Sequence, residues 1–497
     1  MKKWIKENKT EVLIILLIIL LASFLRFYRL SEYMTFLGDE GRDALMIQRI
    51  LVEHDLPLVG PPSSVGNIYL GPLYYYMMII PMAIFWLNPV AATGMVAVLG
   101  VAAVILLYFL ARRWFGFIPA IFAATLYAIS PVTIIYSRSS WNPNPTPFFT
   151  LLAFLGLYLA RLKGDFRWLI LTGVSLAAAI QMHYLALILI PIFVILWIYE
   201  IAIEKRIKAK THFLFGSLGA VVTFIIIMLP LIVFDFRYNF MNFHALMTLF
   251  TDKNSLVGLS IIYPEGILSI YINKLIGRYM AAENNLIALI LAILTIIPLI
   301  VALKNKILNK VIKWPYFALG VWLIVGLLGL LLYKKEIYDH YLGFLSPAPF
   351  LLVGGAVNLL KERWQIIAIS MGIILLGSLN LLKNPLLLPP NNQLTRTQEI
   401  AKFVINESKN KPFNFALLAS RNYDSAYQFY LDLYGHKPKV VPVDVTDQLF
   451  VVCEDENCNP VVSPKYEIAA FGMTKVDWEN YVAGVKVYRL VANPEGK

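Results

Sequence analysis

Long apolar runs recur along most of the chain and are separated by short polar stretches. Because a helix of roughly 20 mostly apolar residues crosses the hydrocarbon core of a bilayer, each run predicts a transmembrane helix. The pattern predicts about 11 spans. They lie approximately at residues 12–30, 91–111, 117–135, 147–162, 168–183, 185–202, 213–234, 285–303, 316–333, 342–360 and 364–382.

The basic residues between these runs indicate how the chain is threaded. When all basic clusters are placed in the cytoplasm, the positive-inside rule gives one consistent topology with a cytoplasmic N-terminus. No small-residue cleavage site follows the first apolar run, so we expect it to be a retained span. The clusters are Lys2–Lys9, Arg112 with Arg113, Arg161–Arg167, Lys205–Lys210, Lys304–Lys313 and Lys361–Arg363.

A further apolar stretch, Pro72–Leu87, does not fit as a span, because the next run would then carry Arg112 and Arg113 to the outside. We expect it to lie along the outer surface, with Tyr74–Tyr76 and Trp86 at the lipid headgroups. A buried half-span that packs on its neighbours is the alternative.

The composition changes after Lys383, where Asn and Pro residues form a linker to a polar tail. The periodicity of this tail predicts a small α/β domain over 384–497, and the odd span count places it outside the membrane. Residues 1–383 are the expected transmembrane domain. The tail's predicted helices are Thr397–Ser408 and Asp424–Tyr434, and its predicted strands are Phe413–Leu418, Val440–Val443, Leu449–Val452 and Val485–Val491.

Composition agrees with a membrane protein, since only 15% of the residues are charged, against about 25% in a soluble domain. The formal charge of +12 would suggest nucleic-acid binding in a soluble protein, but these cations lie at span ends and orient the chain. We expect no nucleic-acid partner. Cys453 and Cys458 have no neighbouring histidine and make a poor metal site, while a disulfide between them stays open.

The first outer loop, Ser31–Gly71, carries the densest ionisable cluster of the membrane part. Asp39 and Glu40 are flanked by Gly38 and Gly41, which allow a close approach of backbone or ligand. Solvated loop charges at the membrane edge are the alternative interpretation.

Four segments resemble motifs of one family. FLGDEGRDALMIQRIL is similar to its acidic first-loop motif and YLGPLYYYMMIIPM to its Pro-Leu-Tyr-Tyr segment, while YSRSSWNPNP and YDHYLGFLSPAP resemble two outer-edge motifs more loosely. The family is that of the GT-C membrane glycosyltransferases, in the family 39 branch of protein O-mannosyltransferases and aminoarabinose transferases. The resemblance implies a GT-C-like fold and a polyprenyl-phosphate sugar donor. The chain departs from many relatives in having Leu70, Gly71 and Pro72 in place of Lys-Pro-Pro.

The resemblance assigns Asp39 as the general base, by its match to the first acidic residue of the motif. Glu40 would orient the acceptor or the loop, and Arg42 would meet the donor phosphate. Such a transfer needs one base for the attacking hydroxyl and cations for the leaving phosphate, unlike glycoside hydrolysis with its second, protonated carboxyl group.

Further candidates for the phosphate or substrate lie at the outer edge. Arg138, His340 and Tyr341 are the first of these, with interfacial anchoring as the alternative. Lys334 and Lys335 could bind the phosphate instead.

The sequence thus predicts a membrane glycosyltransferase with a polyprenyl-phosphate sugar donor and a lipid, glycan or protein acceptor, acting with inversion on the outer face of the plasma membrane. We expect no cofactor and no metal ion. The alternative is a transporter or flippase of lipid-linked sugars. The charges gather at the outer edge, whereas transporters place ionisable groups near the midplane.

Overall fold

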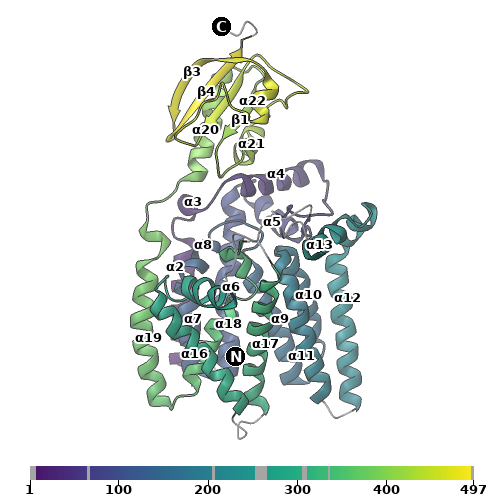
Figure 1. The fold of residues 1–497 in the computed structure, drawn as a ribbon, viewed down its shortest axis with the longest axis vertical. Coiled ribbons are helices and arrows are strands. Elements are labelled where there is room, and N and C mark those ends of the chain that lie inside the picture. Colours follow the sequence, from purple (N-terminus) through teal and green to yellow (C-terminus); the bar gives the residue numbers. More distant parts are fainter. Residues whose placement is uncertain are drawn as a thin grey trace.

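The computed structural model describes residues 7–63, 68–203, 207–251, 266–304, 310–333 and 336–493. Most of the molecule is a bundle of helices, and a small sheet with its own helices stands on one end of it (Figure 1). We call this end of the bundle the domain end and the opposite end the basic end.

Each predicted span overlaps a helix of the bundle, although the predicted span 117–135 is divided into α7 and the short helix α8 (Pro131–Tyr136). In the described part of the chain, eight are long and apolar enough to cross a membrane, whereas α7, α10 and α18 are shorter. The number of crossings therefore stays a prediction. The bundle consists of α2 (Lys9–Phe27), α6 (Pro89–Phe115), α7 (Phe117–Ile129), α9 (Thr146–Lys163), α10 (Trp168–Met182), η1 (Tyr184–Ile188) with α11 (Leu189–Ile203), α12 (Ile207–Arg237), α16 (Asn285–Lys304), α17 (Lys310–Leu331), α18 (Pro347–Asn358) and α19 (Glu362–Leu382).

Apolar side chains cover the outside of the bundle. Leu214, Leu218 and Ile225 of the peripheral helix α12 are exposed, as are many large apolar residues of α2, α16 and α19. Exposing each of these side chains to water instead of an apolar environment would cost roughly 1.5–3 kcal/mol of transfer free energy. The protein is therefore a multi-pass membrane protein, as the composition predicts.

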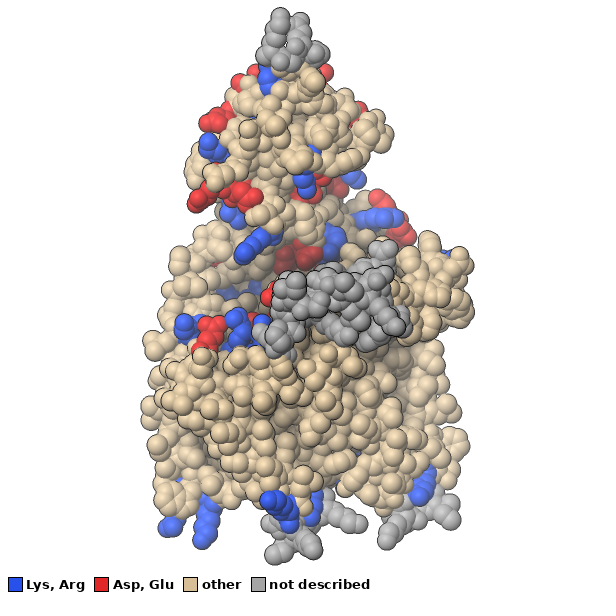
Figure 2. Space-filling view, viewed as in Figure 1, with Lys and Arg blue, Asp and Glu red and all other residues tan. Residues whose placement is uncertain are grey.

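Lys and Arg side chains lie along the basic end on the face that Figure 2 shows. Two of the cations at this end pair with acidic residues, Arg112 with Glu11 and Arg161 with Glu200. Arg112 and Arg113 lie in the last turn of α6, and Arg161 and Lys163 in that of α9. The predicted clusters around 204–206 and 305–309 lie outside the described residues. This distribution matches the sequence-based topology, while the cytoplasmic location of this end stays a prediction.

Short elements build the domain end. They are α3 (Leu30–Tyr33), α4 (Gly38–Glu53), α5 (Leu73–Ile84), α8 (Pro131–Tyr136), α13 (Met241–Thr251), α15 (Ile267–Ser269), η2 (Ile270–Arg278), η3 (Asp339–Leu342) and η4 (Pro385–Leu387).

Helix α5 occupies the stretch expected to be interfacial. Trp86, just after it, is exposed, whereas Tyr74 and Tyr75 are buried. One face of α5 therefore packs on its neighbours, because its tyrosines join a core shared with α4. The expectation that Tyr74 and Tyr75 lie at the headgroups is wrong.

The C-terminal part contains α20 (Gln393–Ser408), α21 (Ser425–Leu433) and α22 (Tyr466–Phe471) with a four-stranded sheet. The strands β1 (Asn414–Leu418), β2 (Leu449–Cys453), β3 (Thr474–Val482) and β4 (Val485–Ala492) lie in the order β1-β2-β4-β3. Strands β1 and β2 pair in parallel, with Ala416 opposite Val451, and the other pairs are antiparallel. Cys453 and Cys458 form a disulfide.

One predicted strand is absent from this sheet, and one strand of the sheet was not predicted. Val440–Val443 forms a turn, because Pro442 has no backbone N–H to offer a neighbouring strand. Strand β3 was not predicted, because its side chains are mostly exposed and its sequence lacks an apolar alternation. Helices α20 and α21 confirm the two predicted helices to within a few residues.

The C-terminal part packs on the segment that follows α2. A single buried core contains Ala44 and Ile47 of α4, Tyr75 of α5, and Ala426 and Tyr430 of α21. Helix α4 thus lies between the bundle and the C-terminal part (Figure 1). Whether 1–383 and 384–497 are separate domains stays a prediction.

Candidate active site

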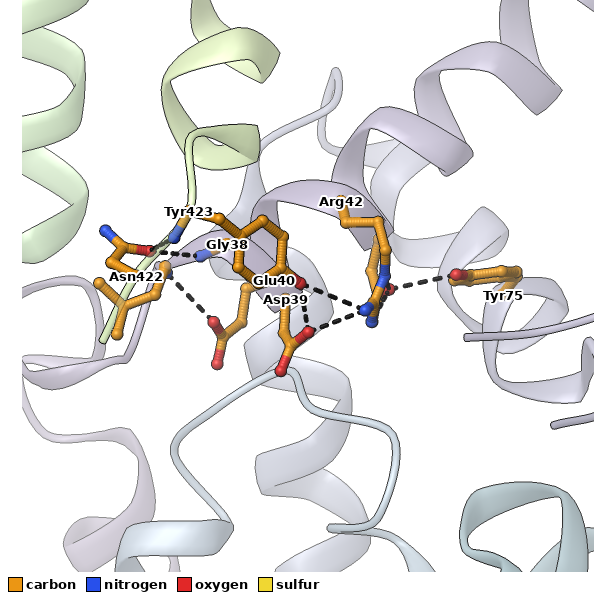
Figure 3. Close-up of polar contacts among 9 residues, drawn as sticks. Gly38, Asp39, Glu40, Arg42, Tyr75, Asn422 and Tyr423 are labelled. Carbon is orange, nitrogen blue, oxygen red and sulfur yellow. Dashed lines mark hydrogen bonds and ion pairs between the residues drawn. The ribbon is translucent and has the colours of Figure 1, made fainter. Parts of the chain in front are cut away.

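Asp39 lies in the first turn of α4, where the positive end of the helix dipole favours a negative side chain. Its Oδ1 accepts hydrogen bonds from Arg42 Nη1 at 2.8 Å and from the Tyr423 hydroxyl (Figure 3). No described residue donates to its Oδ2. The side chain is 37% exposed, and its hydrogen bonds to described residues occupy Oδ1 alone.

Arg42 joins Asp39 to a second carboxylate. Its Nη2 and Nε donate to Asp43 Oδ1 at 2.7 and 2.9 Å, and the Tyr75 hydroxyl donates to the same oxygen at 3.2 Å. Asp43 is fully buried, and its Oδ2 has no hydrogen-bond partner among the described residues. Burial raises the pKa of Asp43 to about 7, against the opposing effect of Arg42.

Glu40 points away from Arg42 and anchors the start of α4. Its Oε2 accepts from the backbone N–H of Leu37 at 3.1 Å, and its Oε1 accepts from the Ser139 hydroxyl at 2.7 Å. Burial raises the pKa of this carboxyl. These contacts fit the predicted role of orienting the loop.

A cavity of about 260 Å³ opens beside Asp39 and Arg42. We call it the Arg42 cavity. His340 and Tyr341, two of the predicted candidates, line it from η3, and His183 lines it from the end of α10. The structure therefore brings together four of the six predicted site residues: Asp39, Arg42, His340 and Tyr341.

His340 is held among aromatic rings. Its ring centroid lies 4.3 Å from that of Trp141 and 4.4 Å from that of Tyr341. Burial lowers the pKa of His340 to about 3, so the imidazole is neutral near pH 7. It can donate a hydrogen bond to a phosphate but carries no positive charge there. Lys334 and Lys335 lie outside the described residues.

Arg138 is not among the residues that line the Arg42 cavity. Its guanidinium is buried and donates to the backbone carbonyls of Leu25 and Tyr28 at 3.0 and 2.7 Å. It also lies over the ring of Tyr33. These contacts connect the segment after α8 to the end of α2, and they leave its predicted phosphate contact without structural support.

Sequence reasoning missed the segment Arg421–Tyr423, which brings the C-terminal part to Asp39. Asn422 Oδ1 accepts from the backbone N–H of Gly38 at 2.9 Å (Figure 3). The glycines beside Asp39 and Glu40 were the sequence signal for this contact. A Cβ at Gly41 would lie only 2.2 Å from the backbone nitrogen of Ala426, so the contact requires a glycine. The predicted close approach at Gly38 and Gly41 is therefore that of α21 and the residues before it.

The described residues contain no group of three or more His, Cys, Asp or Glu side chains that could hold a metal ion. Asp39 and Asp43 instead share a guanidinium. Metal independence of the chemistry stays a prediction.

The structure thus combines a helical membrane bundle, a charged helix α4 close to the end of α2, and a small sheet on the same end of the bundle. Residues 70–233 match the family model described as dolichyl-phosphate-mannose-protein mannosyltransferase. This range covers α5 to α12 but not α4. The match therefore leaves the role of Asp39 untested.

A curated relative also matches part of the chain. A putative mannosyltransferase, YkcB of Bacillus subtilis (strain 168), is 29% identical over 235 residues, which are 46% of this chain and 32% of the relative. The chain thus aligns with about a third of the length of this curated relative.

Solved structures extend the likeness to the whole chain. ArnT from Cupriavidus metallidurans, bound to undecaprenyl phosphate, has a TM-score of 0.62 at 14% identity over 98% of this chain and 99% of its own. An oligosaccharyltransferase of Archaeoglobus fulgidus has a TM-score of 0.51 at 13% identity, over 88% of this chain and 64% of its own. At these identities the likeness concerns the fold, and it confirms the predicted GT-C resemblance.

Proposed function

We propose that this protein is a glycosyltransferase that moves a sugar from a polyprenyl-phosphate donor to a hydroxyl of a lipid, glycan or protein acceptor. The observation that carries the proposal is the Asp39–Arg42 pair at a cavity on the domain end of a GT-C bundle. The matches to mannosyltransferases and to a structure with bound undecaprenyl phosphate support the donor class.

In the proposed reaction, the acceptor hydroxyl gives its proton to Asp39 Oδ2 while its oxygen bonds to the anomeric carbon. The bond from that carbon to the phosphate oxygen breaks, and its electron pair stays on the phosphate. Attack from the side opposite the phosphate inverts the anomeric centre. Arg42 and neutral hydrogen-bond donors such as His340 stabilise the phosphate charge.

The charge on Arg42 is already shared with Asp39 and Asp43. A donor phosphate must therefore take hydrogen bonds from Arg42 that one of these carboxylates now accepts. Asp39 is the partner that the reaction itself neutralises, because it gains the proton of the acceptor. The same guanidinium can thus serve the base before the transfer and the phosphate during it.

The basic rim supports a cytoplasmic location for the basic end, and hence a site on the outer face of the cell membrane. A transporter of lipid-linked sugars remains the second candidate from the sequence. Neither the family match nor the similar structures favour it.

The direct test is sugar transfer from radiolabelled polyprenyl-phosphate monosaccharides, with membrane extracts as the acceptor source. Replacing Asp39 by Asn should lower the transfer rate by about 10²–10⁴-fold, the usual contribution of a general base. Asp55→Asn is the matched control, because Asp55 follows α4 and pairs on the surface with Arg49. Wild-type transfer by a folded Asp39→Asn protein would exclude Asp39 as the base.

A further inference from the structure

Asp39 also lines a second cavity, whose walls come from the start of α4, the end of α8 and the C-terminal part. It also measures about 260 Å³, and its walls include Glu40, Ser139 and the segment Arg421–Tyr423. We call it the Arg421 cavity. Figure 2 shows charged side chains gathered at this junction between the sheet domain and the bundle.

The two cavities share only Asp39 and Trp141 among their lining residues. One carboxylate is therefore accessible from two separate spaces. Arg42 and His340 line one space only, and Arg421 and Tyr423 line the other only. Arg42 and His340 thus lie in a different cavity from the C-terminal residues, and the Tyr423 hydroxyl joins the two walls by accepting from Arg42 Nη1 at 3.2 Å.

The wall formed by the C-terminal part is held in place by its own contacts. Asn422 accepts from the N–H of Gly38, and its Nδ2 donates to Glu454 Oε2 at 3.0 Å. The Tyr427 hydroxyl donates to the other oxygen of Glu454 at 2.6 Å. These hydrogen bonds connect the wall both to α4 and to Glu454, which follows strand β2.

We propose that the Arg421 cavity is the acceptor subsite and that it takes a sugar unit of a glycan acceptor. The inference rests on the proposed transfer reaction. An inverting displacement needs the attacking hydroxyl and the leaving phosphate on opposite sides of the anomeric carbon. A donor phosphate in the Arg42 cavity and an acceptor in the Arg421 cavity would occupy different spaces that both border Asp39, as such a displacement requires.

The lining points to a carbohydrate. Tyr136, Trp141 and Tyr423 offer ring faces and edges against which the apolar face of a sugar can pack. Arg421 and Asp39 supply a donor and an acceptor of hydrogen bonds for sugar hydroxyls. The volume is just below the range of about 300–1,000 Å³ common for small-molecule pockets, so it suits a single sugar unit.

Cysteine protection tests the subsite without relying on turnover. Arg421→Cys places a thiol in the Arg421 cavity, and Ser63→Cys places one in the Arg42 cavity. The two native cysteines are joined in a disulfide and do not compete. Labelling by a small maleimide is followed with three probes: a mixture of methyl hexosides, a Ser/Thr-containing peptide, and polyprenyl-phosphate mannose.

The methyl hexosides should slow labelling of Arg421→Cys at least about threefold and leave Ser63→Cys unchanged, while the polyprenyl-phosphate sugar should do the reverse. Protection of Arg421→Cys by the peptide alone would overturn the glycan class. Protection of Ser63→Cys by the donor, with none at Arg421→Cys by either acceptor probe, would overturn the subsite but not the proposed function. Protection of neither thiol would count against both.

Discussion

At the scale of single residues, Asp43 is a carboxyl group of the site to which sequence analysis assigned no role. It is fully buried and holds Arg42 from the side opposite Asp39. Since burial raises the pKa of Asp43 to about 7, its charge changes within the physiological range. The net charge around Arg42 therefore depends on pH.

This dependence predicts tighter donor binding at low pH. Below pH 7 Asp43 is protonated, so the site around Arg42 gains one unit of positive charge. A phosphodiester donor should then bind roughly fivefold more tightly at pH 6 than at pH 8, on the order of 1 kcal/mol for one screened charge. Asp43→Asn should keep the tighter affinity at both values. Donor dissociation constants of both proteins check this, and a pH dependence that survives in Asp43→Asn would contradict it.

Tyr423 is expected to act through Asp39 as a positioning residue. Its hydroxyl and Arg42 fix Oδ1 of Asp39 and leave Oδ2 open. Because a hydrogen bond to a charged group contributes about 1.5–3 kcal/mol, Tyr423→Phe should lower kcat at least about tenfold with little change in the donor KM.

The matched control for Tyr423→Phe is Tyr430→Phe. This change removes a hydroxyl of α21 that accepts a hydrogen bond from Gln398 of α20 and does not contact Asp39. Steady-state kinetics of both variants distinguish a positioning role of Tyr423 from a general structural effect. Equal losses of kcat in both would indicate a general structural effect and not positioning of Asp39.

Single residues were predictable where a local pattern marks them. The Gly-Asp-Glu-Gly sequence identified Asp39 and Glu40, and the structure places both at the start of α4. Arg138 shows the limit, since its partners are backbone carbonyls of a distant helix that a sequence pattern does not reveal. Tyr423 was not predictable, because 384 residues separate it from Asp39 along the chain.

At the scale of elements, the contact between α4 and α21 brings the C-terminal part to the site. Gly41 is the point of closest approach, as a Cβ there would lie 2.2 Å from the backbone of Ala426. Gly41→Ala should therefore push the two helices apart, at a cost of typically 1–3 kcal/mol for an overpacked contact.

Gly94→Ala in α6 is the control for Gly41→Ala, because nothing lies within 4 Å of the added methyl group. Proteolysis of the linker and transfer activity check this prediction together. Faster cleavage and lower activity are expected for Gly41→Ala only. If both variants behaved like the wild type, α21 would not need close contact with α4.

Helices were more predictable than strands. An apolar run that is long enough to cross a bilayer predicts a transmembrane helix and excludes most other structures. The bundle helices therefore followed from run length and composition. The edge strand β3 has no recognisable apolar pattern. It is a strand because its backbone pairs with β4, and a sequence pattern does not show that pairing. Val440–Val443 is apolar enough for a strand, yet Pro442 excludes regular pairing.

At the scale of the whole molecule, the distribution of charge predicts the orientation in the membrane. Lys361 lies before α19 at the basic end, and Val443 is exposed on the C-terminal part. A membrane-impermeant maleimide should label Val443→Cys on intact cells, and it should label Lys361→Cys only after permeabilisation. The opposite pattern would place the proposed site in the cytoplasm.

The contact between Tyr423 and Asp39 also bears on when the protein becomes active during its synthesis. A ribosome that has made the chain as far as Lys383 has already produced Asp39, Arg42 and every bundle helix. The side chains that hold Asp39 from above and close the Arg421 cavity are still missing. A nascent chain that ends at Lys383 therefore carries an incomplete site, and under the proposed function it becomes competent for transfer only after residues 384–493 have folded.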